Sequence, residues 1–182
     1  MTTATTPALI AGTWTIDPAH SEVGFTVRHL MTKVRGSFRE FEGTIEVAEE
    51  PAASKATAVI QLASLDTGTK QRDDHVRSGD FLDIANHPTM TFVSTGIKPD
   101  GDGFVLTGDL TIKGTTRSVD LAAEFVGVDE DPYGNTRAGF EASTTIDRKA
   151  FGVDTNVPLG GEKFLIGDQV SVQLSVQAIL QK

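Results

Sequence analysis

The sequence has no cysteine among its 182 residues, which excludes disulfide bonds, cysteine-based zinc sites and thiol chemistry. It also has no run of about 18 apolar residues, the length that a helix needs to cross a bilayer. Basic residues are few, 16 against 25 acidic ones, and the formal net charge is −9. This charge argues against a nucleic-acid backbone or an anionic membrane as the main partner. Neither a P-loop nor a dinucleotide fingerprint is present, so no cofactor is predicted.

The N-terminus lacks the features of a targeting signal. Residues 1–7 are rich in threonine and uncharged, and the apolar run at 9–11 is too short for a secretion signal. We therefore expect a disordered tail at residues 1–11 and one domain at residues 12–182. The same features predict a cytoplasmic protein with no stable membrane insertion.

The main positive feature of the sequence is alternation with a period of two. Apolar Val23, Phe25 and Val27 alternate with polar or small residues, and the stretch from Val170 to Ala178 alternates in the same way. About eight or nine such stretches follow one another, mostly separated by short turns, and each indicates a strand with one buried face. This pattern is typical of an antiparallel sandwich or a closed barrel. An eight-stranded barrel is just wide enough to hold side chains or one small ligand.

Residues 69–84 interrupt the strands with a helical insertion. Asp73 and Arg77 have the acid-first spacing that favours an ion pair on one helix face. Asp80 is placed to cap a second turn, which is apolar and carries Phe81, Leu82 and Ile84. A polar helix followed by an apolar plug suits a lid over the mouth of a β-structure, and the alternative is a solvated crossover between two strands.

Residues with catalytic or metal-binding chemistry are scattered. Asp17, His20 and Ser21 lie close together, but a triad is defined by spatial roles, and no G-x-S-x-G elbow is present. The four histidines have no metal-ligand spacing, and the acidic turns at 100–103 and 129–135 lack the later bidentate acid of a calcium loop. The sequence therefore predicts no catalytic residue and no metal site.

Phenylalanine is abundant, with ten residues against one tyrosine. Several fall on the apolar side of their segments: Phe25, Phe41, Phe81, Phe92, Phe104 and Phe125. They can fill a core, or they can line an apolar cavity with a few polar groups at its mouth. The pattern leaves both interpretations open.

Several motifs resemble those of the YceI family of lipocalin-like β-barrel proteins. The segment WTIDPAHS at 14–21, followed by VGF at 23–25, resembles the family's opening W-x-I-D-x-x-H-S motif. The segment RDDHVRSGDFLD at 72–83 resembles its R-D-x-H-L-x-S-x-D-F-F-D helix, with Val76 and Leu82 as departures. Further segments resemble family motifs in the same order: GSF at 36–38, FEG at 41–43, GDLTIKGTT at 108–116 and IDRKAFG at 146–152.

The resemblance implies an all-β fold, an antiparallel eight-stranded lipocalin-like barrel with one helical insertion at about residues 69–84. It implies binding rather than catalysis. The ligand would be a long polyisoprenoid, such as a polyprenyl phosphate or an isoprenoid quinone, held inside the barrel. Many relatives are periplasmic. Relatives also often form dimers, so a homodimer is a further expectation.

An isoprenoid tail would lie among apolar side chains of the strands and the plug: Phe25, Phe41, Phe81, Phe92, Leu106 and Leu110. Burial of each CH₂ contributes about 0.8 kcal/mol, so a long tail can supply most of the affinity. The headgroup would lie near polar residues at the mouth: His20, Arg72, His75 and Arg148. The planar fork of an arginine suits a phosphate because it bonds bidentately.

Three alternatives stay open. The charges of Arg72, Asp73, Asp147 and Arg148 could form a buried network that braces the helix against the barrel. An enzyme or stress-response factor could use the same cavity for a small apolar substrate, with His29 or Asp109 as acid or base if they point inward. A filled barrel would instead indicate a structural or interaction protein.

Overall fold

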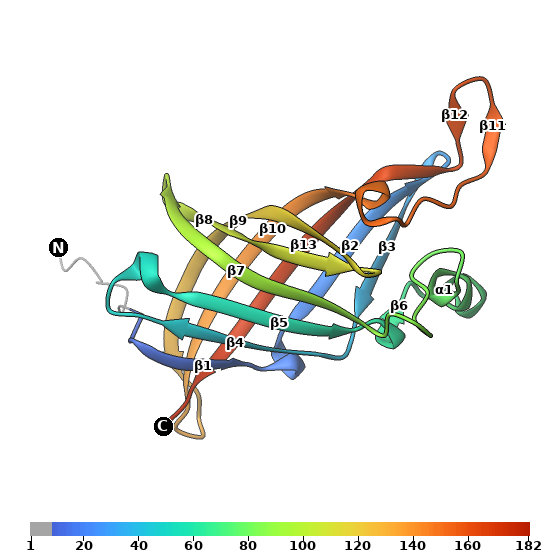
Figure 1. Cartoon of the computed structure of the whole chain (residues 1–182). Coiled ribbons are helices and arrows are strands. Elements are labelled where there is room, and N and C mark those ends of the chain that lie inside the picture. Colours follow the sequence, from blue (N-terminus) through green and yellow to red (C-terminus); the bar gives the residue numbers. More distant parts are fainter. Residues whose placement is uncertain (1–8) are drawn as a thin grey trace.

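The computed structural model describes residues 9–182, so most of the predicted N-terminal tail, residues 1–8, lies outside the described residues. The described part consists mainly of long antiparallel strands, with one α-helix and four short 3-10 helices (Figure 1). The elements in chain order are β1 Gly12–Ile16, η1 Pro18–His20, β2 Glu22–His29, β3 Thr32–Phe38, β4 Phe41–Val47, η2 Pro51–Ala53, β5 Lys55–Gln61, η3 Leu62–Ser64, β6 Leu65–Asp66, α1 Lys70–Arg77, β7 Thr89–Asp100, β8 Gly103–Ile112, β9 Thr115–Glu130, β10 Thr136–Asp147, η4 Arg148–Phe151, β11 Pro158–Gly160, β12 Lys163–Phe164 and β13 Ile166–Leu180.

Eight of these strands close into an antiparallel barrel. Their order is β1-β4-β5-β7-β8-β9-β10-β13, and a second pairing between β13 and β1 completes the circle. The N-terminal part of β13 pairs with β2 instead, so β2, β3 and β6 extend the wall at one end. The predicted all-β fold, an antiparallel eight-stranded barrel with one helical insertion, is confirmed.

The two ends of the barrel are filled differently. At the end near the termini, Trp14, Ala138 and Ala178 are fully buried, and the rings of Phe125 and Phe140 pack against them. A larger apolar cluster lies toward α1, which covers the opposite end (Figure 1). The termini end is therefore a packed core, and the apolar cavity described below lies toward α1.

The helical insertion is shorter than predicted and is capped differently. Only Lys70–Arg77 is α-helical, and the following turn begins at Ser78, whose hydroxyl accepts from the Asp80 amide. The predicted cap by Asp80 is therefore wrong. Arg77 pairs with Asp74 instead of Asp73, because Asp73 is buried beneath the helix.

Candidate functional site

An apolar cavity of about 340 Å³ lies at the end of the barrel that α1 covers. Its wall combines the inner faces of β2, β3 and β13 with α1, the turn after it, η4 and the segment 153–157. The lining is almost wholly apolar. The volume lies toward the lower end of the range of about 300–1,000 Å³ for small-molecule sites.

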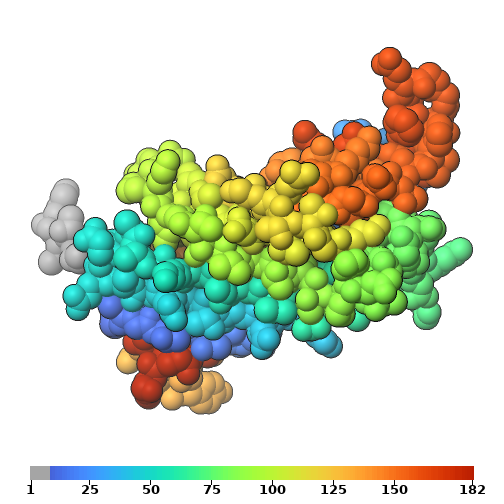
Figure 2. Space-filling view, in the orientation of Figure 1, coloured from blue at the N-terminus to red at the C-terminus, as the bar shows by residue number. Residues whose placement is uncertain are grey.

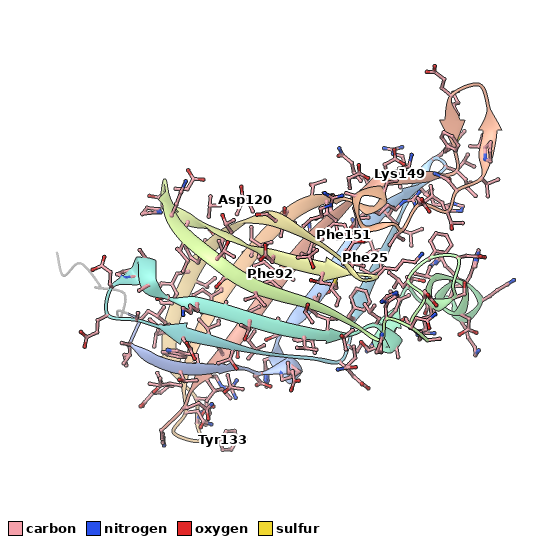
Figure 3. All side chains as sticks on the ribbon, viewed as in Figure 1. Phe25, Phe92, Asp120, Tyr133, Lys149 and Phe151 are labelled. Carbon is pink, nitrogen blue, oxygen red and sulfur yellow. The ribbon has the colours of Figure 1, made fainter. Side chains whose placement is uncertain are left out.

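The pairing register of the strands makes one continuous apolar wall. Phe25 on β2 pairs with Val172 on β13, and Val27 pairs with Val170 two residues further along. On its other side Phe25 pairs with Gly36 of β3, where the absence of a side chain leaves room for the ring. Since successive side chains of a strand point to opposite faces, all these apolar residues face the barrel interior. Phe25 lies toward the α1 end of the barrel (Figure 3).

The segment that follows β6 covers the cavity. Phe81 and Leu82 in the turn after α1 are buried and line the cavity from this side. The buried carboxylate of Asp73 accepts hydrogen bonds from the amide and hydroxyl of Thr67, which fixes the start of the helix. The hydroxyl of Thr155 donates to the carbonyl of Asp80, so the segment 153–157 is tied to the same turn. The polar helix and its apolar plug thus form a cover over a cavity, as the lid interpretation predicts.

The polar side chains of the lining include nitrogen donors from two sides. Nε of Arg72 donates to the hydroxyl of Thr67 over 2.7 Å, and Nη2 donates to the carbonyl of Thr67 over 2.7 Å. In residues 9–182 its Nη1 has no partner. His75 Nε2 lies 3.0 Å from Asp80 Oδ2, and its ring stands edge-on to Phe81. His29, the last residue of β2, also lines the cavity. The mouth therefore offers one fixed cation and two imidazoles to a polar group.

Arg148 also lines the cavity but is committed to the backbone. Only 6% of the residue is exposed, and its guanidinium donates to carbonyls at both ends of the segment 153–167. Burial lowers the pKa of Arg148, while the charges of Asp168, Asp147 and Asp154 oppose that shift. The predicted network of Arg72, Asp73, Asp147 and Arg148 does not form among the described residues. Arg72 and Asp73 both bond to Thr67, and Arg148 bonds to backbone carbonyls.

Half of the predicted site residues line this cavity. Those that do are Phe25, Phe81, Arg72, His75 and Arg148. Those that do not are Phe41, Phe92, Leu106, Leu110 and His20. Phe41 and Leu110 pack into the larger apolar cluster, and Phe92 is buried with its ring against Gly108, nearer the middle of the barrel (Figure 3). The inward direction of these apolar side chains follows the alternation. Phe92 and Leu110 lie two residues further along their strands than the cavity residues Met90 and Ile112.

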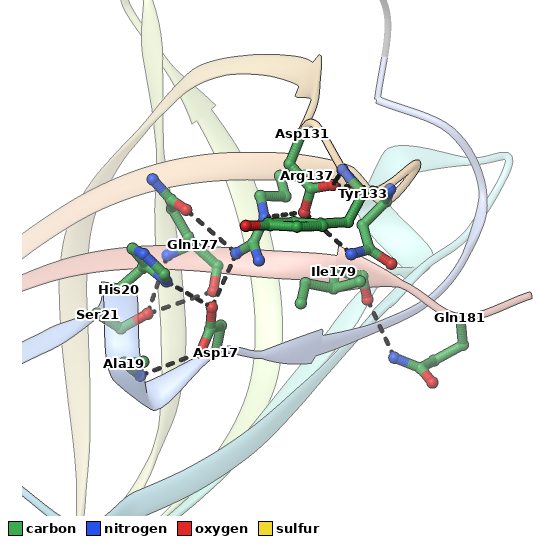
Figure 4. A network of polar contacts seen from close by, with 11 residues as sticks. Asp17, Ala19, His20, Ser21, Asp131, Tyr133, Arg137, Gln177, Ile179 and Gln181 are labelled. Atoms are coloured by element: carbon green, nitrogen blue, oxygen red, sulfur yellow. Dashed lines mark hydrogen bonds and ion pairs between the residues drawn. The ribbon is translucent and has the colours of Figure 1, made fainter.

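His20 belongs to a polar cluster at the termini end (Figure 4). Its Nδ1 lies 2.8 Å from Asp17 Oδ2, and Arg137 bridges Asp17 and Asp131 over 2.8 and 2.7 Å. The hydrogen bond from Arg137 holds the pKa of Asp17 below its usual value, and the same guanidinium holds the pKa of Asp131 far below its usual range. The cluster ties β10 to the turn between β1 and β2, far from the cavity mouth.

Several cavity residues were not singled out from the sequence. They include Val23, Val27, Ile146, Phe151, Val170 and Val172. All but Phe151 follow the same alternation as Phe25, so the inward pattern identified them as interior without distinguishing cavity from core. Phe151 belongs to η4; the sequence placed it in the IDRKAFG motif at 146–152 but gave it no role in a site.

The other chemical candidates are separated in space. Ser21 Oγ donates to the carbonyl of Gln177 and has no contact with His20 in the described part of the chain, so no triad forms. Asp109 is exposed on the outer face of β8. Within residues 9–182 no group of three or more metal-ligating side chains comes together. No helix of this part is long and apolar enough to cross a membrane.

Comparisons with known proteins agree with this geometry. A family model described as the YceI-like domain matches residues 14–178. The chain is 40% identical over 165 residues to Protein YceI of Escherichia coli (strain UMN026). The aligned region covers 90% of this chain and 83% of that protein.

Solved structures share the fold. BcnA of Burkholderia cenocepacia has a TM-score of 0.77 and 27% identity, covering 89% of this chain and 98% of its own. A polyisoprenoid-binding domain from Saccharophagus degradans has a TM-score of 0.67 and 16% identity, covering 92% of this chain and 98% of its own. The second likeness concerns the fold alone.

Proposed function

Since the chain belongs to the YceI-like domain family, we propose that its barrel binds a long isoprenoid lipid, with the tail in the cavity beneath α1. A polyprenyl phosphate and an isoprenoid quinone are the two candidates. The observation that carries this proposal is the cavity of about 340 Å³, apolar inside and bordered by nitrogen donors. A protein with the same fold is described as a polyisoprenoid-binding domain, which makes isoprenoids the first class to test.

The proposed headgroup position is beside Arg72 and His75. The Nη1 group of Arg72 is available to a phosphate, because Nε and Nη2 alone are used to hold Thr67. Arg148 has four carbonyl acceptors and is a poorer candidate, so its proposed role is to shape the wall. A charge-assisted bond from arginine to phosphate is about twice as strong as a neutral one, which would favour the phosphate over the free alcohol.

The cavity is small for a complete polyprenyl chain. As it stands, its volume takes a small apolar molecule or one end of a longer chain. A longer tail requires Phe81 and Leu82 to move, and both lie in turns rather than in the barrel wall. We propose binding without catalysis, and the cytoplasmic location and the homodimer stay predictions.

Mass spectrometry of an organic extract, from protein purified out of its native host, tests the ligand class. A stoichiometric species with an isoprenoid mass ladder is expected. A clean extract together with no binding of added geranylgeraniol, geranylgeranyl phosphate or a quinone would contradict the proposal.

The headgroup position is tested with Arg72→Gln and a matched control on the same helix. Arg72→Gln should weaken geranylgeranyl phosphate binding about tenfold and leave geranylgeraniol binding unchanged. Lys70→Gln removes a charge from a side chain that is 88% exposed and pairs with Asp74, so it should change neither. Equal loss of both ligands in Arg72→Gln would place the headgroup elsewhere.

A further inference from the structure

Exposed apolar side chains gather on two hairpins at the rim of the cavity. Nine large apolar residues are exposed in residues 9–182, and five of them lie here: Leu30, Met31, Val157, Leu159 and Phe164. Met31, at the tip between β2 and β3, is 86% exposed, and Phe164 on β12 is 50% exposed. Soluble surfaces scatter such residues singly, so a concentration at one place indicates an interaction surface.

The two hairpins form one continuous rim. The Leu30 amide donates to the Leu165 carbonyl over 2.8 Å, and the Leu165 amide donates to the Val157 carbonyl over 3.0 Å. The hairpin of β11 and β12 projects beyond the barrel (Figures 1 and 2). His29, Val157 and Leu165 line the cavity as well. The rim therefore joins the cavity wall to an exposed apolar edge.

Charge at the rim differs in sign from the rest of the molecule. Residues 28–35 and 149–168, which leave out the buried Arg148, hold five basic and three acidic residues, a net charge of +2 in a chain whose net charge is −9. The neighbouring segment 70–83 is close to neutral, with three basic and four acidic residues. Lys149 lies 5.6 Å from the Phe164 ring and close to the same end of the barrel (Figure 3). At least one basic group of the rim thus stands directly beside an exposed apolar side chain.

From these observations we infer that the rim docks on the surface of a lipid bilayer that contains anionic lipids. The tips at Met31 and Phe164 enter the interface, the basic side chains lie among the headgroups, and the mouth faces the bilayer. Apolar side chains combined with Lys and Arg are the composition that binds such interfaces peripherally. The inference rests on the proposed function, since a docked mouth could take up an isoprenoid directly from the bilayer.

The whole-chain charge, which argued against an anionic membrane, acts here as an orienting force. Only three of the 25 acidic residues lie in the two rim segments, and salt screens the repulsion from the others beyond about 8 Å at physiological ionic strength. An anionic bilayer attracts the basic rim and repels the acidic remainder of the molecule, so the protein approaches the bilayer with its rim first.

Vesicle flotation tests this inference with the full chain. The protein is mixed with vesicles of phosphatidylcholine containing roughly one third phosphatidylglycerol, and with vesicles of phosphatidylcholine alone. We expect co-flotation with the first at low salt, and about tenfold weaker binding in the double variant Met31→Asp/Phe164→Asp. Tyr133→Asp is the matched control, because Tyr133 is 87% exposed at the termini end, and it should float like the original protein.

Binding of geranylgeraniol in the absence of vesicles separates the two proposals. The double variant should keep it, since both substituted side chains are exposed and lie outside the cavity lining. If the original protein itself does not bind geranylgeraniol, the result would instead contradict the proposed function. The docking inference is overturned if the original protein fails to float, or if the double variant floats equally well. It is also overturned if sedimentation shows a dimer of the original protein that the double variant converts to monomers while neither floats.

Discussion

The ring of Phe25 occupies the space that a side chain on Gly36 would need. A β-carbon placed on Gly36 would lie 2.4 Å from Cζ of Phe25, far inside van der Waals contact. Gly36 therefore lets the Phe25 ring lie against β3 and leaves the adjacent cavity open. Glycine in a strand often marks such a close approach.

Gly36→Ala should push the Phe25 ring into the cavity and weaken geranylgeraniol binding about tenfold. Native mass spectrometry or fluorescence titration measures the change. Gly96→Ala on β7 is the control, since its β-carbon would have no atom within 4 Å and Gly96 does not line the cavity. Equal affinities of the two variants would mean that the ring position does not limit the cavity.

Val172→Phe should fill the cavity from the β13 side. We expect loss of ligand binding, with the free energy of unfolding changed by less than about 1.5 kcal/mol because the larger ring enters existing space. Ser171→Phe places the same ring one residue earlier on β13, where the side chain is exposed and points to the outer face of the barrel. This variant should bind the ligand normally. Normal binding by Val172→Phe would place the ligand outside this cavity.

Arg148→Met should destabilise the protein by about 3 kcal/mol, because buried carbonyls lose a charged donor. Urea unfolding followed by circular dichroism measures the change. Arg35→Met makes the same substitution at an exposed position on β3, and its effect should stay within about 0.5 kcal/mol. An equally small loss of stability in Arg148→Met would show that the segment 153–167 holds its conformation without the arginine side chain.

Arg137→Met should reduce the dependence of stability on acid pH. Arg137 lowers the pKa of Asp17 and Asp131 in the folded protein, so both carboxylates contribute stability above their usual pKa near 3.8. This contribution is lost as pH falls below about 4, through the lower folded values. Without Arg137 the protein should be less stable at pH 7, and its melting temperature should fall less steeply from pH 4 downward.

Thermal unfolding between about pH 2 and 7 measures this effect. Arg39→Met is the control, since the Arg39 side chain is 73% exposed in its pair with Asp66 and contributes little. A pH profile in Arg137→Met that matches the original protein would contradict the assignment.

The strands were predictable because the pleat of a strand fixes the side-chain period at two. Val170, Val172 and Leu174 face inward wherever β13 pairs, so one pattern in the sequence establishes both strand and face. Turns depend on local residue types instead, and the acidic segment predicted at 129–135 does contain the turn between β9 and β10. The insertion was predicted as an apolar plug, although its cap and its ion pair were not, because burial of Asp73 overrides the helix spacing.

The candidate site was only half predictable, because a cavity depends on height along the barrel axis. Phe25 and Phe92 have the same local pattern, but Phe25 lies at the α1 end and Phe92 nearer the middle. His20 was placed at the mouth by its residue type, whereas the pairing of β1 with β13 puts it at the opposite end. Arg148 was expected to meet a carboxylate or a ligand, and irregular backbone supplies its acceptors instead.

The seam between β1 and β13 joins Trp14 to Leu180 and Ile16 to Ala178, residues more than 160 positions apart in the sequence. During synthesis the β1 edge stays unpaired on this side until residues 178–180 have left the ribosome. Contacts between such distant positions make folding slow, and an unpaired strand edge is open to other chains while it waits. A truncation of a few C-terminal residues would leave that edge exposed permanently, so loss of residues 178–180 should produce aggregation rather than a slightly shorter barrel.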